Sequence, residues 1–256
     1  LYQDGWYART IHRPAWKFKP DNSLQDDKWQ LFNTKEDFSL ATDVAVQNPD
    51  KLKAMQDLFM TEAEKYHVLP IDDRLLERTN AELMGRPTVM GKRTSATYGE
   101  GMKGMGVDIF IDLRNKSYTI TADVEVKANG NGVIVCQGGK FGGLSFYIKD
   151  GKPSFSYNVL GLESSHIVAT QTLMPGKYTL VYDFKFDGAP GKGGNGTITA
   201  NGNKIAEGRI NRTQPGIFSV DDLADIGVDD GTHVADYGTS SKFNGKINKV
   251  TIEQKK

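Results

Sequence analysis

The chain has 256 residues, with 32 Lys and Arg against 32 Asp and Glu and a hydrophobic content of 38%, a composition typical of a globular protein of one or two domains. A formal net charge of zero provides no long-range field for capturing phosphate, so we expect no nucleic-acid partner. The single cysteine excludes a disulfide framework. The apolar runs are far shorter than the ~20 residues of a membrane-spanning helix, so we expect no membrane span.

The first 75 residues predict a small α+β subdomain with short antiparallel strands and one helix. Strand-like segments cover 7–12 and 28–33, between turn-forming residues. Asn48 suits the N-cap of a helix and Pro49 its first position, and the helix is expected to continue to Tyr66. Its apolar stripe, which we expect to pack on the two strands, consists of Leu52, Met55, Phe59, Ala63 and Tyr66.

The middle of the chain, 76–106, is rich in Gly and Pro and predicts a connector. After it the sequence alternates between apolar and polar residues, most clearly over 118–126 and 178–186, as strands with one buried and one solvated face do. Asp150-Gly151 and Asn201-Gly202 suit two-residue hairpin turns.

Many short strands joined by such turns predict an all-β domain over 107–256, and we favour a two-sheet jelly-roll sandwich over a small closed barrel. The chain starts at Leu1 with neither Met nor an apolar leader, so we interpret it as a segment of a longer protein.

The residues by themselves assemble no catalytic centre. His12, His67, His166 and His233 are dispersed, and none has the spacing of a helical metal site. Glycosidases with a jelly-roll fold need two facing carboxylates. The nearest pair, Asp123 and Glu125, lacks the third acid of the Glu-x-Asp-x-x-Glu pattern and is expected on the solvated face of a strand. We therefore assign no catalytic residue and no metal ligand to this chain.

One acidic loop leaves two interpretations open. Asp229 and Asp230, near Asp225 and Gly231, could hold a calcium ion through oxygen atoms, although the spacing of an EF-hand is absent. Alternatively, the carboxylates accept hydrogen bonds from backbone N–H groups of the loop.

Several motifs resemble the carboxy-terminal part of bacterial arylsulfatases of the alkaline-phosphatase-like superfamily. In the first part of the chain they are Asp4-Gly5-Trp6-Tyr7-Ala8, His12-Arg13-Pro14, Lys28-Trp29-Gln30-Leu31-Phe32-Asn33, Asn48-Pro49-Asp50-Lys51-Leu52 and Leu69-Pro70-Ile71-Asp72-Asp73-Arg74. The second part, including Gln137-Gly138-Gly139-Lys140-Phe141-Gly142-Gly143, resembles the accessory, concanavalin-like β-sandwich of the longer members.

The resemblance implies a C-terminal fragment of a sulfuric ester hydrolase. It would support the fold, the substrate entrance or oligomer contacts. Sulfatases use a formylglycine made from Cys/Ser-x-Pro-x-Arg beside a calcium ion, both in the N-terminal domain. This chain lacks that motif, since Cys136 precedes Gln137-Gly138-Gly139. The chain alone is therefore expected to be inactive and to bind no cofactor. The resemblance implies the N-terminal sulfatase domain as partner, a sulfate ester substrate only through that domain, and a periplasmic or secreted location.

His12 is the one residue that we connect to chemistry, as a substrate-proximal residue at a strand end; the alternative is a structural histidine bonded to a nearby group. Arg13 is expected to face away from it, because consecutive strand residues alternate. Two functions other than the sulfatase fragment also remain: a lectin-like carbohydrate-binding β-sandwich module, and a freestanding glycosidase.

Overall fold

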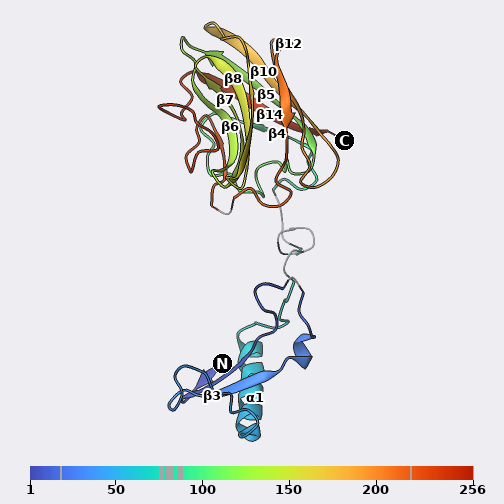
Figure 1. The fold of residues 1–256 in the computed structure, drawn as a ribbon, viewed down its shortest axis with the longest axis vertical. Coiled ribbons are helices and arrows are strands. Elements are labelled where there is room, and N and C mark those ends of the chain that lie inside the picture. Colours follow the sequence, from blue (N-terminus) through green and yellow to red (C-terminus); the bar gives the residue numbers. More distant parts are fainter. Residues whose placement is uncertain (18, 75–77, 79–83, 86–88, 220, 256) are drawn as a thin grey trace. The chain divides into compact units, whose positions relative to one another are not determined.

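The computed structural model describes residues 1–17, 19–74, 78, 84–85, 89–219 and 221–255. The chain forms two compact units, Leu1–Arg86 (unit 1) and Pro87–Lys256 (unit 2), which are described separately (Figure 1). No helix among the described residues is long and apolar enough to span a membrane.

Unit 1 consists of a small antiparallel sheet and one α-helix. Both strands and the helix that the sequence predicts are present. The strands lie in the order β1-β2-β3 and are β1 (Tyr2–Gln3), β2 (Trp6–Thr10) and β3 (Trp29–Asn33). A short 3₁₀ helix, η1 (Leu24–Asp26), precedes β3, and α1 (Pro49–Lys65) follows it.

The core of unit 1 is small. Ala8 of β2, Leu31 of β3 and Met55 of α1 are its fully buried members, so the helix packs on the strands as its apolar stripe predicts. Phe59 is only half-buried, with its ring edge on Trp29 at a centroid distance of 5.5 Å.

Both ends of α1 differ from the prediction. Asn48 occupies the N-cap position, but its side-chain amide donates to the carbonyl of Val44 instead of capping the helix. Tyr66, expected in the buried stripe, is 65% exposed at the C-cap, where the helix ends and its face no longer meets the sheet.

Unit 2 is the predicted two-sheet antiparallel sandwich (Figure 1). One sheet has the order β12-β11-β10-β5-β14-β4, with strands Asn203–Ile210, Gly194–Ala200, Gly176–Phe186, Ser117–Val126, Lys246–Lys255 and Ser95–Tyr98. The other has the order β13-β6-β7-β8-β9, with strands Ala224–Ile226, Gly132–Gly139, Gly142–Lys149, Lys152–Val159 and Glu163–Val168.

The segment expected as a connector, 76–106, differs from the prediction in its later part. It contains β4, which pairs with β14, and Met105, which forms a β-bridge with Ala224. These residues belong to the sandwich, because their apolar side chains complete its core. Residues 76, 77, 79–83 and 86–88 of the segment lie outside the described residues.

The core of unit 2 fills the space between the sheets. Alternate residues of β5 are buried, as its sequence predicts, and Phe155 of β8 stacks on Tyr182 of β10 at a centroid distance of 3.6 Å. Both hairpin turns are as predicted: Asp150 and Gly151 have φ of 52° and 74°, and Asn201 and Gly202 have 48° and 83°.

Strand β6 is buried along its whole length, because both faces of its sheet are covered there. The segment 228–242 covers the outer face of the sheet, and a second small core lies between the segment and the sheet. Its members are Val133, Cys136, Tyr147, Val234 and Tyr237. Burial raises the pKa of the Cys136 thiol well above its usual range.

Candidate functional site

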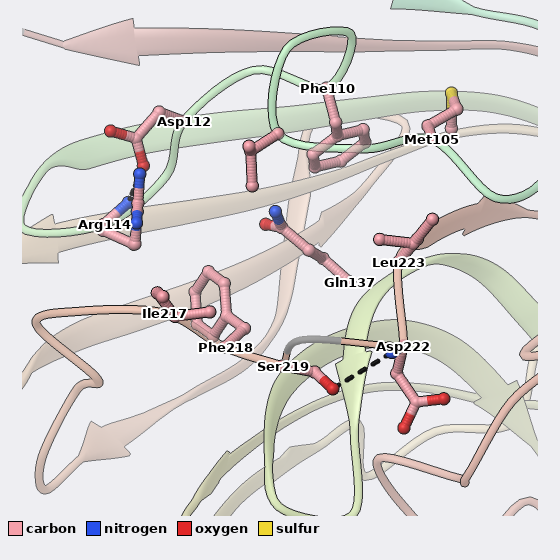
Figure 2. A pocket seen from close by; sticks show the side chains of 11 residues that line it. Met105, Phe110, Asp112, Arg114, Gln137, Ile217, Phe218, Ser219, Asp222 and Leu223 are labelled. Atoms are coloured by element: carbon pink, nitrogen blue, oxygen red, sulfur yellow. Dashed lines mark hydrogen bonds and ion pairs between the residues drawn. The ribbon is translucent and has the colours of Figure 1, made fainter. Parts of the chain in front are cut away.

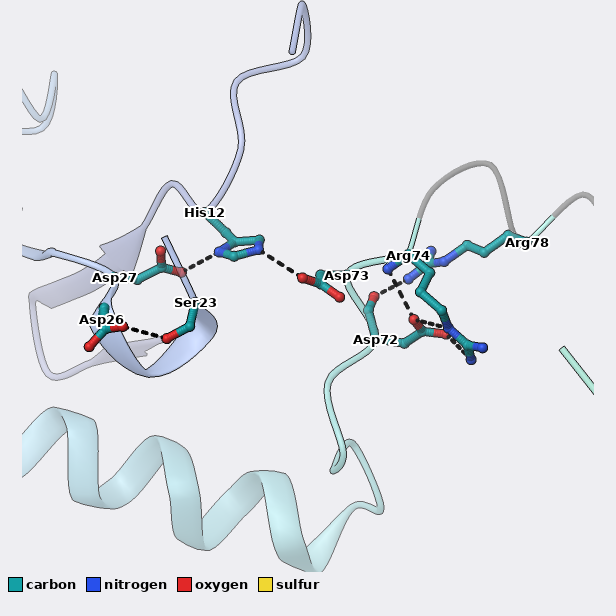
Figure 3. Close-up of polar contacts among 8 residues, drawn as sticks. All are labelled: His12, Ser23, Asp26, Asp27, Asp72, Asp73, Arg74 and Arg78. Carbon is teal, nitrogen blue, oxygen red and sulfur yellow. Dashed lines mark hydrogen bonds and ion pairs between the residues drawn. The ribbon is translucent and has the colours of Figure 1, made fainter. Parts of the chain in front are cut away.

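His12, the predicted site residue, lies two positions after β2 and bridges two carboxylates of unit 1 (Figure 3). Its Nδ1 is 2.8 Å from Asp27 Oδ2, just after η1, and its Nε2 is 3.3 Å from Asp73 Oδ2. The hydrogen bond to Asp27 raises the pKa of His12, and burial opposes this only partly. Both ring nitrogens are thus engaged within the chain, as in the structural alternative. The substrate-proximal role stays a prediction.

A hollow of about 380 Å³ adjoins His12. Arg13 lines it together with His12, contrary to the expectation that the two residues face apart, because the chain has left the strand at Thr10 and turned. Arg13 donates to the carbonyl of Lys17.

The acidic loop near Asp229 uses its carboxylates to hold the backbone. Asp229 accepts from the Val234 N–H at 3.0 Å and the Tyr237 hydroxyl at 2.7 Å, and Asp225 accepts from the N–H groups of Gly104 and Asp230. Burial raises the pKa of Asp229. Over the part of the chain that the structure describes, no three His, Cys, Asp or Glu side chains are grouped to hold a metal ion.

The loops at one end of the sandwich converge on a cleft, which we call the loop-end cleft (Figure 2). It is formed by the β4–β5 connection, the end of β6 and the β12–β13 connection. Asn115 donates to the Pro215 carbonyl at 2.9 Å and Arg114 to the Gly216 carbonyl at 2.9 Å, so the two connections are tied together. Most of its lining is apolar: Met105, Val107, Phe110, Ile217, Phe218 and Leu223.

The amide of Gln137 lies among these apolar side chains (Figure 2). The residue is 8% exposed, and its Oε1 has no hydrogen-bond partner among the described residues. It lies on the core side of β6 because its cross-strand neighbour, Leu144, is also a core residue. The sequence does not single out Gln137 as a site residue, because an amide within a glycine-rich strand end gives no sign that it is buried.

The polar rim of the cleft includes an ion pair. Arg114 Nε donates to Asp112 Oδ1 at 2.7 Å. Burial acts to raise the pKa of Asp112, but the hydrogen bond and charge of Arg114 outweigh it and hold the pKa below its usual range. Lys116 Nζ is 3.7 Å from Asp112 Oδ2, so two cationic side chains share this carboxylate at the mouth.

A second polar cluster lies on the outer face of the five-stranded sheet. Ser156 Oγ of β8 is 2.7 Å from Nδ1 of His166 of β9, and the Tyr147 hydroxyl of β7 is 3.0 Å from the same Oγ. In the sequence His166 is only a dispersed histidine, because its contact with Ser156 depends on the strand register.

Comparisons with known proteins find solved structures of similar fold, and they assign the chain to no family. No family model matches, and no curated protein matches. A SAP-like pentraxin from Limulus polyphemus is 14% identical over 64% of this chain and 78% of its own, with a TM-score of 0.38. The CBM40 of Ruminococcus gnavus IT-sialidase, bound to α2,3-sialyllactose, is 14% identical over 62% and 90%, with a TM-score of 0.40. Domains LG4-5 of the mouse laminin α1 chain are 12% identical over 64% and 39%, with a TM-score of 0.40.

The resemblance to arylsulfatases is therefore corrected. These similar structures are lectin-like β-sandwiches and none is a sulfatase, and no sulfatase family model matches. The N-terminal sulfatase partner and the sulfate ester expected with it have no support. The shared motifs consist largely of Gly, Pro, Trp and Asp, which recur wherever strands and turns alternate, so they do not distinguish one such family from another.

Proposed function

We propose that unit 2 is a carbohydrate-binding module and that the loop-end cleft is its binding site. The observation that carries the proposal is Gln137, which lines the cleft and whose buried Oε1 has no hydrogen-bond partner among the described residues. A buried polar atom left unpaired costs about 1–3 kcal/mol. A ligand hydroxyl in the cleft would supply the missing hydrogen bond after a small rotation of the Gln137 amide that turns Oε1 toward it.

The size of the cleft limits what enters it. Its volume of about 30 Å³ takes roughly two water-sized groups, since one water needs ~10–15 Å³. A hydroxymethyl group has this size. A pyranose ring would remain at the mouth, where Ile217 is 45% exposed.

The chemistry of the mouth suits a neutral sugar. A sugar presents hydroxyl groups around its edge and C–H groups on its faces, so it needs planar polar groups beside an apolar surface. The ion pair of Asp112 and Arg114 supplies the polar groups, and Phe218 and Ile217 supply the apolar surface. The carboxylates of Asp112 and Asp222 balance the charges of Arg114 and Lys116, so the mouth gives no net attraction to an acidic sugar.

Affinity electrophoresis of the full chain in native gels that contain laminarin, xylan or galactan tests this function. We expect at least one of these polysaccharides to retard the protein. Gln137→Met preserves the side-chain length and removes the amide, so it should clearly weaken the retardation. The same substitution should raise the melting temperature slightly, because it removes an unpaired buried polar atom.

Gln171→Met is the matched control, since Gln171 is exposed in the β9–β10 connection, and it should behave as the wild type. Migration of the wild type that none of the three polysaccharides changes would contradict the proposed function. Equal retardation of the wild type and Gln137→Met would move the site away from the cleft.

A further inference from the structure

We propose that the outer face of β9 is a second carbohydrate-binding surface, in which the Nε2–H group of His166 donates to a ligand hydroxyl. This inference depends on the proposed carbohydrate binding by unit 2 but uses none of the residues of the loop-end cleft.

The strand register brings the residues of this surface together. Ser156 is paired with His166 across β8 and β9, and with Ser145 across β7 and β8. Their sequence neighbours Phe155 and Ile167 belong to the core between the sheets, so Ser156 and His166 lie on the opposite, outer face. His166 is exposed, whereas Ser156 is 1% exposed.

The hydrogen bonds select one tautomer of the His166 ring. The chain of contacts runs from the Tyr147 hydroxyl to Ser156 Oγ and on to His166 Nδ1. Tyr147 is 4% exposed, so its proton needs a partner inside the protein, and Ser156 Oγ is the acceptor at hand. The proton of Ser156 must then go to Nδ1.

If the ring instead carried its proton on Nδ1, the Nδ1–H group would donate to Ser156 Oγ. One of the two buried hydroxyl protons, of Ser156 or Tyr147, would then have no acceptor along this chain of contacts. The Nδ1 atom is therefore the acceptor, and the neutral ring carries its proton on Nε2. No partner of Nε2 is found within the described part of the chain, so a fixed N–H donor remains available on an exposed side chain.

The neighbours of His166 on the same face complete a surface for a hydroxyl-bearing ligand. Ser164 and Val168 lie two residues before and after it on β9, and both are exposed. Along this face the strand thus presents a hydroxyl, an N–H donor and an apolar side chain at intervals of about 7 Å. A sugar, with hydroxyl and C–H groups side by side, matches this alternation.

A Ser–His pair at 2.7 Å also invites comparison with a nucleophile and its general base. A nucleophile must reach its substrate, and Ser156 is only 1% exposed beneath its neighbours. The pair therefore serves to orient the imidazole and not to attack a ligand.

The test compares two variants of the full chain in the same native gels of laminarin, xylan and galactan. In His166→Asn, the amide oxygen can replace Nδ1 as acceptor for Ser156, while the shorter side chain has no donor at the position of Nε2. We expect an unchanged melting temperature and about tenfold weaker binding of the retarding polysaccharide, the effect of one lost hydrogen bond. Ser156→Ala keeps the ring but frees it, and should weaken binding less.

The matched control is His67→Asn in unit 1, where Asn tolerates the positive φ of 56° and binding should not change. Nitrogen-15 NMR of the His166 ring gives a readout that needs no ligand, and we expect the Nε2–H tautomer. The Nδ1–H tautomer would overturn the inference. If Gln137→Met weakens binding and His166→Asn does not, this surface is excluded while the proposed function stands. If the wild type binds none of the three polysaccharides, both fail.

Discussion

His12 joins two segments of unit 1 that are distant in sequence, the η1 region and the residues after α1. One imidazole lies between Asp27, whose side chain is 2% exposed, and Asp73, whose side chain is 41% exposed (Figure 3). Only the protonated ring can donate to both carboxylates at once. The link is therefore strongest when His12 carries a charge.

This link makes the stability of unit 1 depend on pH. The hydrogen bond to Asp27 raises the pKa of His12, so the folded state binds a proton more tightly than the unfolded state. The stabilisation is complete below about pH 6.5, the pKa of an unperturbed histidine, and disappears as pH rises through the higher pKa of the folded state.

Urea midpoints followed by tryptophan fluorescence measure the effect. They should fall between about pH 6 and pH 8 in the wild type, by a small amount because Asp73 is partly exposed. Asp27→Asn should flatten the dependence, and Asp73→Asn should reduce it by less. A wild-type midpoint that rises over this interval would contradict the role assigned to His12.

The sequence foretold His12 as a residue of interest but not its partners. Asp27 and Asp73 are 15 and 61 residues away, and only the fold of unit 1 brings them to the ring. The same holds for Gln137 and for Ser156 with His166. Their burial and pairing depend on contacts between elements, which a linear pattern does not contain.

Among the elements, the turn between β6 and β7 illustrates how the glycines of this chain are used. Gly142 has φ of 148°, and a Cβ at this position would lie 2.5 Å from the carbonyl oxygen of Phe218. The β12–β13 connection, which supplies a wall of the loop-end cleft, therefore packs directly on the backbone of Gly142. A side chain here would push Phe218 outward.

We expect Gly142→Ala to lower the stability of unit 2 by about 1–3 kcal/mol and to weaken polysaccharide retardation, because the cleft wall must shift. Circular dichroism of the strands during heating measures the first effect. Gly216→Ala is the control, since a Cβ at Gly216 meets nothing within 4 Å. Wild-type stability of Gly142→Ala would show that Phe218 can move freely.

Sequence patterns predicted the elements well where one face is solvated. The alternation in β5 and β10 and the turns at Asp150-Gly151 and Asn201-Gly202 all correspond to the structure. The pattern is uninformative for β6, where the segment 228–242 covers the outer face and every residue is buried. β4 was not predicted because its four residues, in a glycine-rich segment, are too few to show an alternating pattern.

At the scale of the whole molecule, the two units differ in the size of their cores. Unit 1 has a main core of three buried side chains, Ala8, Leu31 and Met55, whereas the core of unit 2 fills the space between two sheets. Small cores give marginal stability, because little apolar surface is removed from water. Unit 1 should therefore unfold before unit 2.

The distribution of tryptophan makes this testable without labels. All 3 tryptophans, Trp6, Trp16 and Trp29, belong to unit 1. In a urea titration, tryptophan fluorescence should change at a lower concentration than the circular dichroism of the strands. Coincident transitions would mean that the two units unfold as one.

The sole cysteine of the chain lies in the second small core of unit 2, beneath the segment 228–242. Its Sγ is 3.4 Å from the carbonyl oxygen of Val228, and the side chain is almost wholly shielded from solvent. A maleimide or disulfide reagent can reach this sulfur only after the covering segment has lifted away. The rate of alkylation at Cys136 thus measures how often that segment opens, and it reports on unit 2, which contains no tryptophan.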